Sequence, residues 1–412
     1  MSGRTGAVGV LLLLLLLLTG CWDLREMNHL ALVMAVGVDK AEEPGRLAVT
    51  VQIARPAGTG QSPGGGGKQD TAGGQVYIAT ADGDTIFGAI RNLAQFTSRR
   101  IMWAHNNVVV IGESLAREDI TPVIDFFTRN QELRMRTWVV VASGTDARSI
   151  VATHTGMEDI PANSISALFR YAQLPGETVP TDMAMITADF FGSDRNPVIA
   201  GIGLRERAVR STGDPENPQL IEQVELAGTA ILNGTRVVGF VQRETGRGLL
   251  WLRRQMKNAV LTIPCPQGRE GNMAVEIRSP QVRIQSSVEG RVPVMTFHVE
   301  TEGWLSEQGC LTPNLRESAL KAYAEKALAQ KIEREMRMTL QVLQQELKTD
   351  AIGYARMVHI QHPGWWLRNQ TRWEALFPMV KTQILISTHI PKMGLYIEPV
   401  QVRRPGGSDS EQ

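Results

Sequence analysis

Residues 224–241 read VELAGTAILNGTRVVGFV, and this stretch carries the clearest topological signal of the chain. The pair Asn233-Gly234 separates two mainly apolar runs, and Asn-Gly suits the two left-handed positions of a type I′ turn. The sequence therefore predicts a β-hairpin with strands at 224–232 and 236–241. We expect this hairpin to open a C-terminal domain, because charged and turn-forming residues in 205–223 indicate a linker before it.

The segments after the hairpin predict further strands and one long helix. The helix can be capped by Thr312, has Pro313 in its first turn, and keeps an apolar stripe to about Lys348. At about 1.5 Å per residue it would be roughly 50 Å long. We expect the stripe to pack across the sheet of its own domain, and the alternative is a docking helix for a partner. Strands are predicted at 259–263, 273–288, 292–300 and 379–390.

The segments before the hairpin predict a second α+β unit. Helices are expected after Asp84 and at 121–127, and residues 145–192 are expected to be mostly helical. Residues 57–75 are rich in glycine and nearly lack apolar side chains, which indicates a flexible loop. A Walker phosphate loop is excluded there, because Gln69 follows Lys68 where the motif needs Ser or Thr. Strands are predicted at 30–38, 47–53, 107–111 and 137–142.

The fold class that these patterns indicate is α+β, with several domains, mixed sheets and packed helices. A signal peptide would occupy residues 1–20, and a frayed tail residues 403–412. Between them we expect an N-terminal α+β region at 21–204, a linker at 205–223 and a hairpin-rich C-terminal α+β domain with the long helix at 224–402.

Composition excludes several classes of protein. The chain has 412 residues, of which 43% are hydrophobic and 21% charged, so it is neither disordered nor fibrous. The 43 Lys and Arg residues nearly balance the 42 Asp and Glu residues. Nonspecific binding to nucleic acid depends on excess positive charge, and we therefore expect no nucleic-acid partner.

The amino terminus predicts export and lipidation. Its uncharged stretch, residues 6–18, is shorter than the roughly 20 apolar residues of a membrane-spanning helix, which favours a signal peptide. Leu18-Thr19-Gly20-Cys21 then forms a bacterial lipobox, so cleavage would fall between Gly20 and Cys21. The Cys21 thiol would carry a diacylglyceryl group and its amine an acyl chain, which together give stable membrane anchoring. The alternative is a plain secretory signal with a coincidental cysteine.

Two cysteines remain after lipidation of the first. Cys265 and Cys310 would lie outside the cytoplasm, where disulfides persist. They can either pair, closing a loop that is worth roughly 4 kcal/mol at most, or stay as two buried free thiols. The sequence leaves both alternatives open.

No constellation of catalytic or metal-binding residues stands out. His359 and His362 have the spacing of a pair on one helical face, but Pro363 and Gly364 follow directly and no third ligand is evident. The aromatic group Trp365, Trp366, Trp373 and Phe377 could meet a partner or the lipid interface, but docking of a helix onto the sheet is the simpler interpretation. We expect no enzyme, no metal and no cofactor apart from the lipid on Cys21.

A series of short strings runs along nearly the whole mature chain. In the first half the strings are Cys21-Trp22-Asp23, Gly37-Val38-Asp39-Lys40, Val51-Gln52-Ile53, Thr85-Ile86-Phe87, Ala89-Ile90-Arg91, Arg99-Arg100 with Trp103, and Asp125-Phe126-Phe127 with Arg129. In the second half they are Gly228-Thr229-Ala230, Leu249-Leu250-Trp251, Pro264-Cys265-Pro266, Asp350 with Gly353, and Trp366 with Trp373 and Phe377-Pro378. Their order and spacing resemble the Ger(x)C family, the C-subunit lipoproteins of nutrient germinant receptors in endospore-forming bacteria.

The resemblance implies a non-enzymatic subunit on the outer face of the spore inner membrane. It implies two partners, the A and B integral-membrane subunits of the receptor, and a need for this subunit in spore germination. A solute-binding lipoprotein of a transporter is the alternative, because it would share the anchor and the size. A cell-wall enzyme held at the membrane is a third hypothesis, based on location alone.

Overall fold

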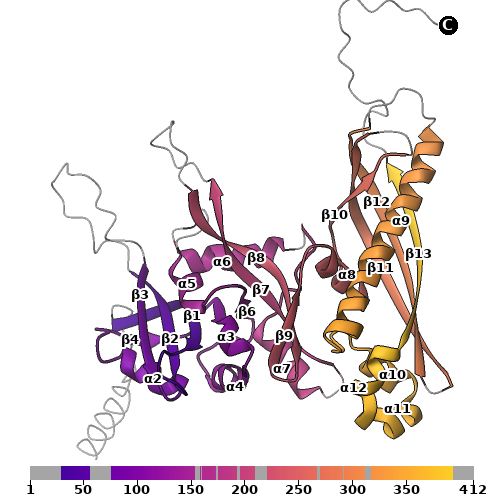
Figure 1. The fold of residues 1–412 in the computed structure, drawn as a ribbon. Coiled ribbons are helices and arrows are strands. Elements are labelled where there is room, and N and C mark those ends of the chain that lie inside the picture. The colour runs from indigo at the N-terminus through magenta and orange to yellow at the C-terminus, as the bar shows by residue number, and fades with distance from the viewer. Residues whose placement is uncertain are drawn as a thin grey trace, which may run out of the picture.

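The computed structural model describes residues 29–55, 76–153, 158, 160–172, 175–192, 195–208, 220–266, 270–290, 292–310 and 317–392. These residues build two mixed sheets with packed helices, which lie side by side in Figure 1. The α+β class is therefore confirmed. The Gly-rich segment 57–75, the helix start at Thr312 and Pro313, the lipobox and the 403–412 tail lie outside the described residues.

The first sheet has nine strands in the order β3-β2-β1-β5-β6-β7-β8-β9, and β4 pairs with β1. Its centre is parallel, from β1 through β5 and β6 to β7, and both flanks are antiparallel. The bounds are β1 (Leu30–Lys40), β2 (Leu47–Ala54), β3 (Val76–Gly83), β4 (Arg100–Met102), β5 (Val108–Ile111), β6 (Trp138–Ala142), β7 (Val198–Ala208), β8 (Leu220–Asn233) and β9 (Arg236–Val241).

Helices cover both faces of the first sheet, which explains why its central strands are uninterrupted apolar runs. In β5, Val109 and Ile111 enter one core, whereas Val108 and Val110 enter the core on the opposite face. The first face is covered by α2 (Ile86–Leu93), α3 (Glu113–Ala116), α4 (Thr121–Arg129) and α7 (Met183–Phe191). The second face is covered by α5 (Ala147–Ala152) and α6 (Pro161–Tyr171).

The hairpin that the sequence predicts is present, but it belongs to the first sheet. Asn233 pairs with Arg236, so the two turn residues are Gly234 and Thr235 and not Asn233 and Gly234. Of these residues Gly234 alone has a positive φ, +59°, which fits glycine at the first position of a type II′ turn, and the predicted type I′ turn is therefore wrong. β8 pairs along its length with β7, for example Ala200 with Thr229. Residues 205–208 and 220–223, expected in a linker, are therefore strand. The expectation failed because a turn motif fixes a hairpin locally but does not identify the third strand beside it.

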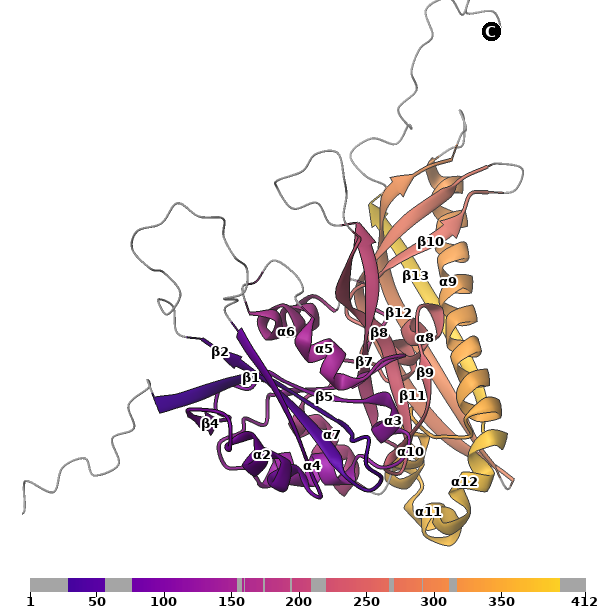
Figure 2. The ribbon, with the colours of Figure 1, turned by 60° about the vertical axis from the view of Figure 1, so that its left-hand side comes forward.

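The second sheet has four strands in the order β10-β11-β12-β13. They are β10 (Val260–Pro264), β11 (Asn272–Glu289), β12 (Val292–Gln308) and β13 (Lys381–Lys392). β12 and β13 are parallel, so the chain must cross over between them, and the long helix α9 (Glu317–Gln341) lies in that crossover. Figure 2 shows α9 running along the sheet. Its buried stripe, which includes Leu328, Ile332 and Met336, confirms packing onto its own sheet.

Shorter helices complete the second unit. They are α8 (Glu244–Leu252), a π-helical turn (Val342–Glu346), α10 (Tyr354–Gln361), α11 (Pro363–Asn369), α12 (Trp373–Leu376), and 3-10 turns at Gln370–Arg372 and Phe377–Met379. Trp366, Trp373 and Phe377 are buried in the core of this unit, which confirms that the aromatic group docks there, although the segment consists of short helices and 3-10 turns and not of one helix. Among the described helices, none is long and apolar enough to span a membrane.

A buried polar cluster joins the two units. Arg253, after α8, donates to the carbonyl of Ala351 and lies 3.8 Å from a carboxylate oxygen of Asp189 on α7. Asp189 also pairs with Arg195. Burial first, and then Arg195, lower the pKa of Arg253 to about 10, so this guanidinium stays charged at neutral pH. The cluster therefore links the first sheet's helical layer to the second unit by charge.

Candidate functional site

A groove of about 1580 Å³ opens on the first unit between α2, α4, β4 and the turn from β1 to β2. We call it the α2–α4 groove. Its apolar lining includes Phe87, Ile90, Ile101, Trp103, Leu115 and Phe126. Figure 1 shows α2 and α4 next to each other at the lower edge of the first sheet.

Helix α2 supplies one wall. The hydroxyl of Thr85 accepts from the backbone N–H of Gly88 at 3.0 Å and caps the helix. Ile86 and Leu93 face the core, so the opposite side of the helix is left to the groove. There Phe87 is 55% exposed, and the Arg91 guanidinium lies 4.9 Å from the centroid of its ring.

Helix α4 and the segment around β4 supply the other wall. Phe126 meets Phe127 edge to face at a centroid distance of 5.0 Å, and Trp103 meets Phe127 in the same way at 5.8 Å. The backbone N–H of Trp103 donates to Glu132 at 3.1 Å. Phe127 is buried in the core, so this aromatic stack fixes Trp103 and Phe126 on the groove side.

Six basic and five acidic side chains line the groove among the described residues. Every carboxylate is engaged, and the pairs are Asp84 with Arg46 (3.4 Å), Glu118 with Lys40, Asp125 with Arg129 (2.8 Å) and Glu132 with Arg100 (3.9 Å). Asp119 accepts from the N–H and the hydroxyl of Thr121 instead. Arg91 and Arg99 have no carboxylate partner within the described part of the chain, so the groove keeps two cations available.

Asp39, at the end of β1 beside the groove, has a structural role. Its two carboxylate oxygens accept from the backbone N–H groups of Ala147 and Arg148, at 2.8 and 2.9 Å, at the start of α5. Gly112 leaves the space for it, because a Cβ there would lie 1.9 Å from the Asp39 carboxylate. Burial raises the pKa of Asp39, although the two N–H donors oppose this.

The predicted histidine pair is used in packing. His362 bonds through Nε2 to the carbonyl oxygen of Ser286 at 2.8 Å, and His359 stacks on Trp366 with ring centroids 5.7 Å apart. Among the described residues, no group of three His, Cys, Asp or Glu side chains is arranged to hold a metal ion.

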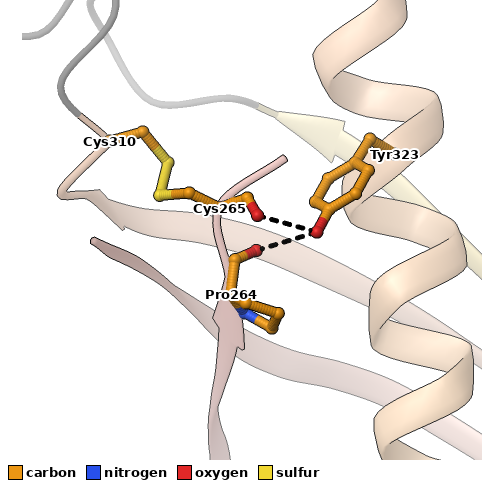
Figure 3. The surroundings of a disulfide bond; sticks show 4 residues. All are labelled: Pro264, Cys265, Cys310 and Tyr323. Carbon is orange, nitrogen blue, oxygen red and sulfur yellow. Dashed lines mark hydrogen bonds between the residues drawn. A yellow bond between two sulfur atoms is a disulfide. The ribbon is translucent and has the colours of Figure 1, made fainter. Parts of the chain in front are cut away.

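Cys265 and Cys310 form a disulfide in the structure, with Cα atoms 5.7 Å apart (Figure 3). The bond joins the chain just after β10 to the chain just after β12. Tyr323 on α9 donates from its hydroxyl to the carbonyl oxygen of Cys265 at 2.9 Å. Of the two alternatives that the sequence leaves open, the structure adopts the paired one.

The remaining predicted site residues, Gly20 and Cys21, lie outside the described residues, so lipidation stays a prediction. Sequence reasoning missed the α2–α4 groove, because its walls come from separate segments between residues 40 and 132. One signal was available. Several strings on which the family resemblance rests, such as Thr85-Ile86-Phe87 and Arg99-Arg100, contribute to this one surface.

Comparison with known proteins finds the same family over both units. Residues 23–204 match the family model described as spore germination protein N-terminal domain. Residues 227–394 match the family described as spore germination B3/GerAC like, C-terminal. The division between these families falls within the segment from β7 to β8, although the sheet itself continues to β9.

Individual relatives and one solved structure also match the chain over most of its length. The chain is 25% identical over 400 residues to spore germination protein KC of Bacillus subtilis (strain 168), covering 95% of this chain and 96% of that protein. It is 22% identical over 388 residues to spore germination protein B3 of the same organism, covering 93% and 97%. The crystal structure of the GerBC protein matches with a TM-score of 0.54 at 19% identity, over 90% of this chain and all of that one, and it supports the fold.

Proposed function

The chain belongs to the Ger(x)C family of spore germination proteins, and we propose that it is the membrane-anchored lipoprotein subunit of a nutrient germinant receptor. The family match carries this proposal, because it covers both units and begins at residue 23, directly after the lipobox. In this account Cys21 bears the lipid and holds the protein on the outer face of the spore inner membrane. The protein has no cofactor besides that lipid.

We further infer that the subunit acts through protein contacts with the A and B integral-membrane subunits. Relatives named spore germination proteins B3 and A3 support membership of receptor complexes. The polar clusters of the described residues serve as helix caps and ion pairs within the fold, which supports a role in binding for this part of the chain. The α2–α4 groove, in contrast, presents aromatic rings and two cations, Arg91 and Arg99, that have no carboxylate partner among the residues that the structure describes.

The Cys21→Ala variant tests the anchor. Without the thiol no diacylglyceryl group can be attached, so we expect the protein to leave the spore membrane fraction and nutrient-triggered germination to be impaired. The matched control is Thr19→Ala, which keeps a small residue in the lipobox and should be retained. Immunoblotting of membrane and soluble fractions, together with germination assays, gives the readout. Unchanged retention and germination of Cys21→Ala would refute the proposal.

The solute-binding alternative receives less support from the fold. Such proteins usually bind their ligand between two lobes of repeated strand and helix alternation. Here the units differ: one is a nine-stranded sheet with helices on both faces, and the other is a four-stranded sheet crossed by α9. A thermal-shift screen of the purified protein against amino acids and sugars tests this alternative, and a tight, specific hit would restore it.

A further inference from the structure

We propose that the α2–α4 groove binds an acidic, amphipathic segment of an integral-membrane partner, close to the point where that segment leaves the bilayer. The inference rests on the proposed function, because it requires that the chain is held at the membrane through Cys21. It adds the surface that makes the contact and the chemistry of the segment that occupies it.

The size of the groove indicates a chain segment as its occupant. Sites for small molecules usually enclose about 300–1,000 Å³. The groove measures about 1580 Å³, and Arg99 is shared with a second hollow of about 380 Å³ that is lined by Tyr77 and Phe96. The two hollows therefore form one extended surface around Arg99, longer than a metabolite needs.

The lining indicates an amphipathic segment. Ile90, Ile101 and Leu115 offer apolar surface within the groove, while Phe87 and Phe96 are 55% and 53% exposed. Exposed aromatic rings that adjoin a hollow provide large contact area, and aromatic residues, Phe included, are enriched at the core of protein interfaces. A helix or strand with one apolar face would cover these side chains and keep its polar face in solvent.

The charges indicate that the segment is acidic. The five carboxylates of the groove are all engaged, whereas Arg91 and Arg99 have no carboxylate partner among the described residues. A carboxylate of the occupant could reach both the guanidinium groups and the aromatic surface beside them. A cationic segment would instead be repelled by these two arginines, and it would find no unengaged carboxylate among the described residues of the groove.

The path of the chain places the groove near the membrane. Leu30 and Ala31, at the start of β1, pair with Arg100 and Ile101 of β4, and both β4 residues line the groove. Residues 21–28 separate the proposed lipidation site from the described chain, and eight residues span at most roughly 29 Å. A segment that reaches the groove must therefore come from the membrane-proximal part of a partner.

An anionic lipid surface is the rival occupant, and the groove is less suited to it. Lipid-binding patches are clusters of four to eight Lys and Arg residues, each worth roughly 1 kcal/mol near an anionic surface. Here acidic side chains alternate with the cations, and four of the cations already pair with them.

Photo-crosslinking in the full-length, lipidated chain tests the proposal. Benzoylphenylalanine is placed at position 87 within the groove, and at position 171 as the control, because Tyr171 is 59% exposed on α6, which covers the opposite face of the sheet. Both proteins carry a tag and are produced in dormant spores, irradiated and purified from inner membranes. We expect an adduct from position 87 with an extracytoplasmic, acidic segment of an integral-membrane protein, identified by mass spectrometry, and none of that kind from position 171.

A charge reversal makes the test quantitative. Arg91→Glu with Arg99→Glu should lower the adduct yield roughly tenfold, because the segment then meets like charges. The control Arg170→Glu reverses an exposed arginine on α6 and should leave the yield unchanged. Equal amounts of the variants in the membrane fraction show that both fold and are retained.

The outcomes separate this inference from the proposed function. An adduct with lipid alone, or no protein adduct from position 87, would refute the proposal that the groove binds a partner segment. The receptor role would stand in that case if the tagged chain still retains integral-membrane proteins. An unchanged yield after charge reversal would refute the proposal for the groove as well. If the tagged wild-type chain retains no integral-membrane protein at all, both proposals fail.

Discussion

At the scale of single residues, Asp350 is the most heavily engaged carboxylate described. It accepts four hydrogen bonds, from the backbone N–H groups of Gly353, Tyr354 and Ala355 and from the indole N–H of Trp373, at 2.8–3.1 Å. Burial raises its pKa, against the opposing effect of these donors. Asp350 thereby fixes the start of α10 and orients a tryptophan of the core.

We predict that Asp350→Asn destabilises the protein by at least about 2 kcal/mol. An asparagine has one acceptor oxygen, so its amide N–H₂ would face donors that are left unsatisfied, at about 1–3 kcal/mol each. The control is Asp182→Asn at the start of α7, where a single N–H, that of Met185, is accepted and asparagine caps equally well. Urea unfolding measures both, and equal midpoints would show that Asp350 has no such role.

At the scale of elements, the contact between α8 and α9 depends on a buried ion pair. Arg247 on α8 donates to Glu335 on α9 at 2.8 Å, and the Glu335 side chain is fully buried. Burial raises the pKa of Glu335, with Arg247 opposing this. Arg247 also donates to Glu177 at 2.8 Å, so loss of Glu335 removes one of two carboxylates that compensate this guanidinium.

Glu335→Ala should therefore cost about 1.5–3 kcal/mol of unfolding free energy, the range for hydrogen bonds to charged groups, because Arg247 keeps its pair with Glu177. Glu333→Ala is the matched control, since Glu333 lies two residues away on the same helix and its pair with Arg337 is exposed to solvent. Exposed pairs of this kind contribute about 0–1 kcal/mol. Denaturant titrations of the two variants provide the comparison, and a loss below about 1 kcal/mol for Glu335→Ala would contradict this account.

The disulfide ties β10 to β12 and should stabilise the second unit. In the chain-entropy model a closed loop with a 45-residue separation is worth roughly 4 kcal/mol, less any strain. The double substitution Cys265→Ser with Cys310→Ser should lower the unfolding midpoint, and reductant should have the same effect on the wild-type chain only. Two free thiols in the denatured, unreduced wild-type protein would contradict the pairing.

Local sequence patterns predicted many elements correctly but missed those that depend on tertiary contacts. The strands at 30–38 and 47–53, the hairpin at 224–241 and the stripe of α9 all follow from periodicity and from the presence of a turn signal, although the turn type predicted from Asn-Gly was wrong. Helix α8 was missed, because Gly246 and Gly248 weaken its local propensity. Both glycines are explained by packing: a Cβ at Gly246 would lie 2.1 Å from the Glu177 carbonyl oxygen, and one at Gly248 2.3 Å from that of Glu335.

At the scale of the whole molecule, the sequence likewise predicts contiguous motifs but not surfaces that are built from distant segments. The lipobox is a contiguous motif, so the sequence alone predicts the anchor. The α2–α4 groove arises only when β4 pairs with β1 and α4 packs beside α2, which brings distant segments together. Which sheet the hairpin joins is likewise decided only in the assembled fold. For these reasons the family and fold class were predictable, whereas the α2–α4 groove was not.

We propose that this chain works as a receptor subunit beside integral-membrane partners. The most direct test is mass spectrometry of the proteins that a tagged copy retains after gentle solubilisation of dormant-spore inner membranes, with an untagged strain as control. We predict enrichment of the A and B integral-membrane subunits of a germinant receptor. Recovery of transporter permease subunits in their place would contradict the account and favour the solute-binding alternative.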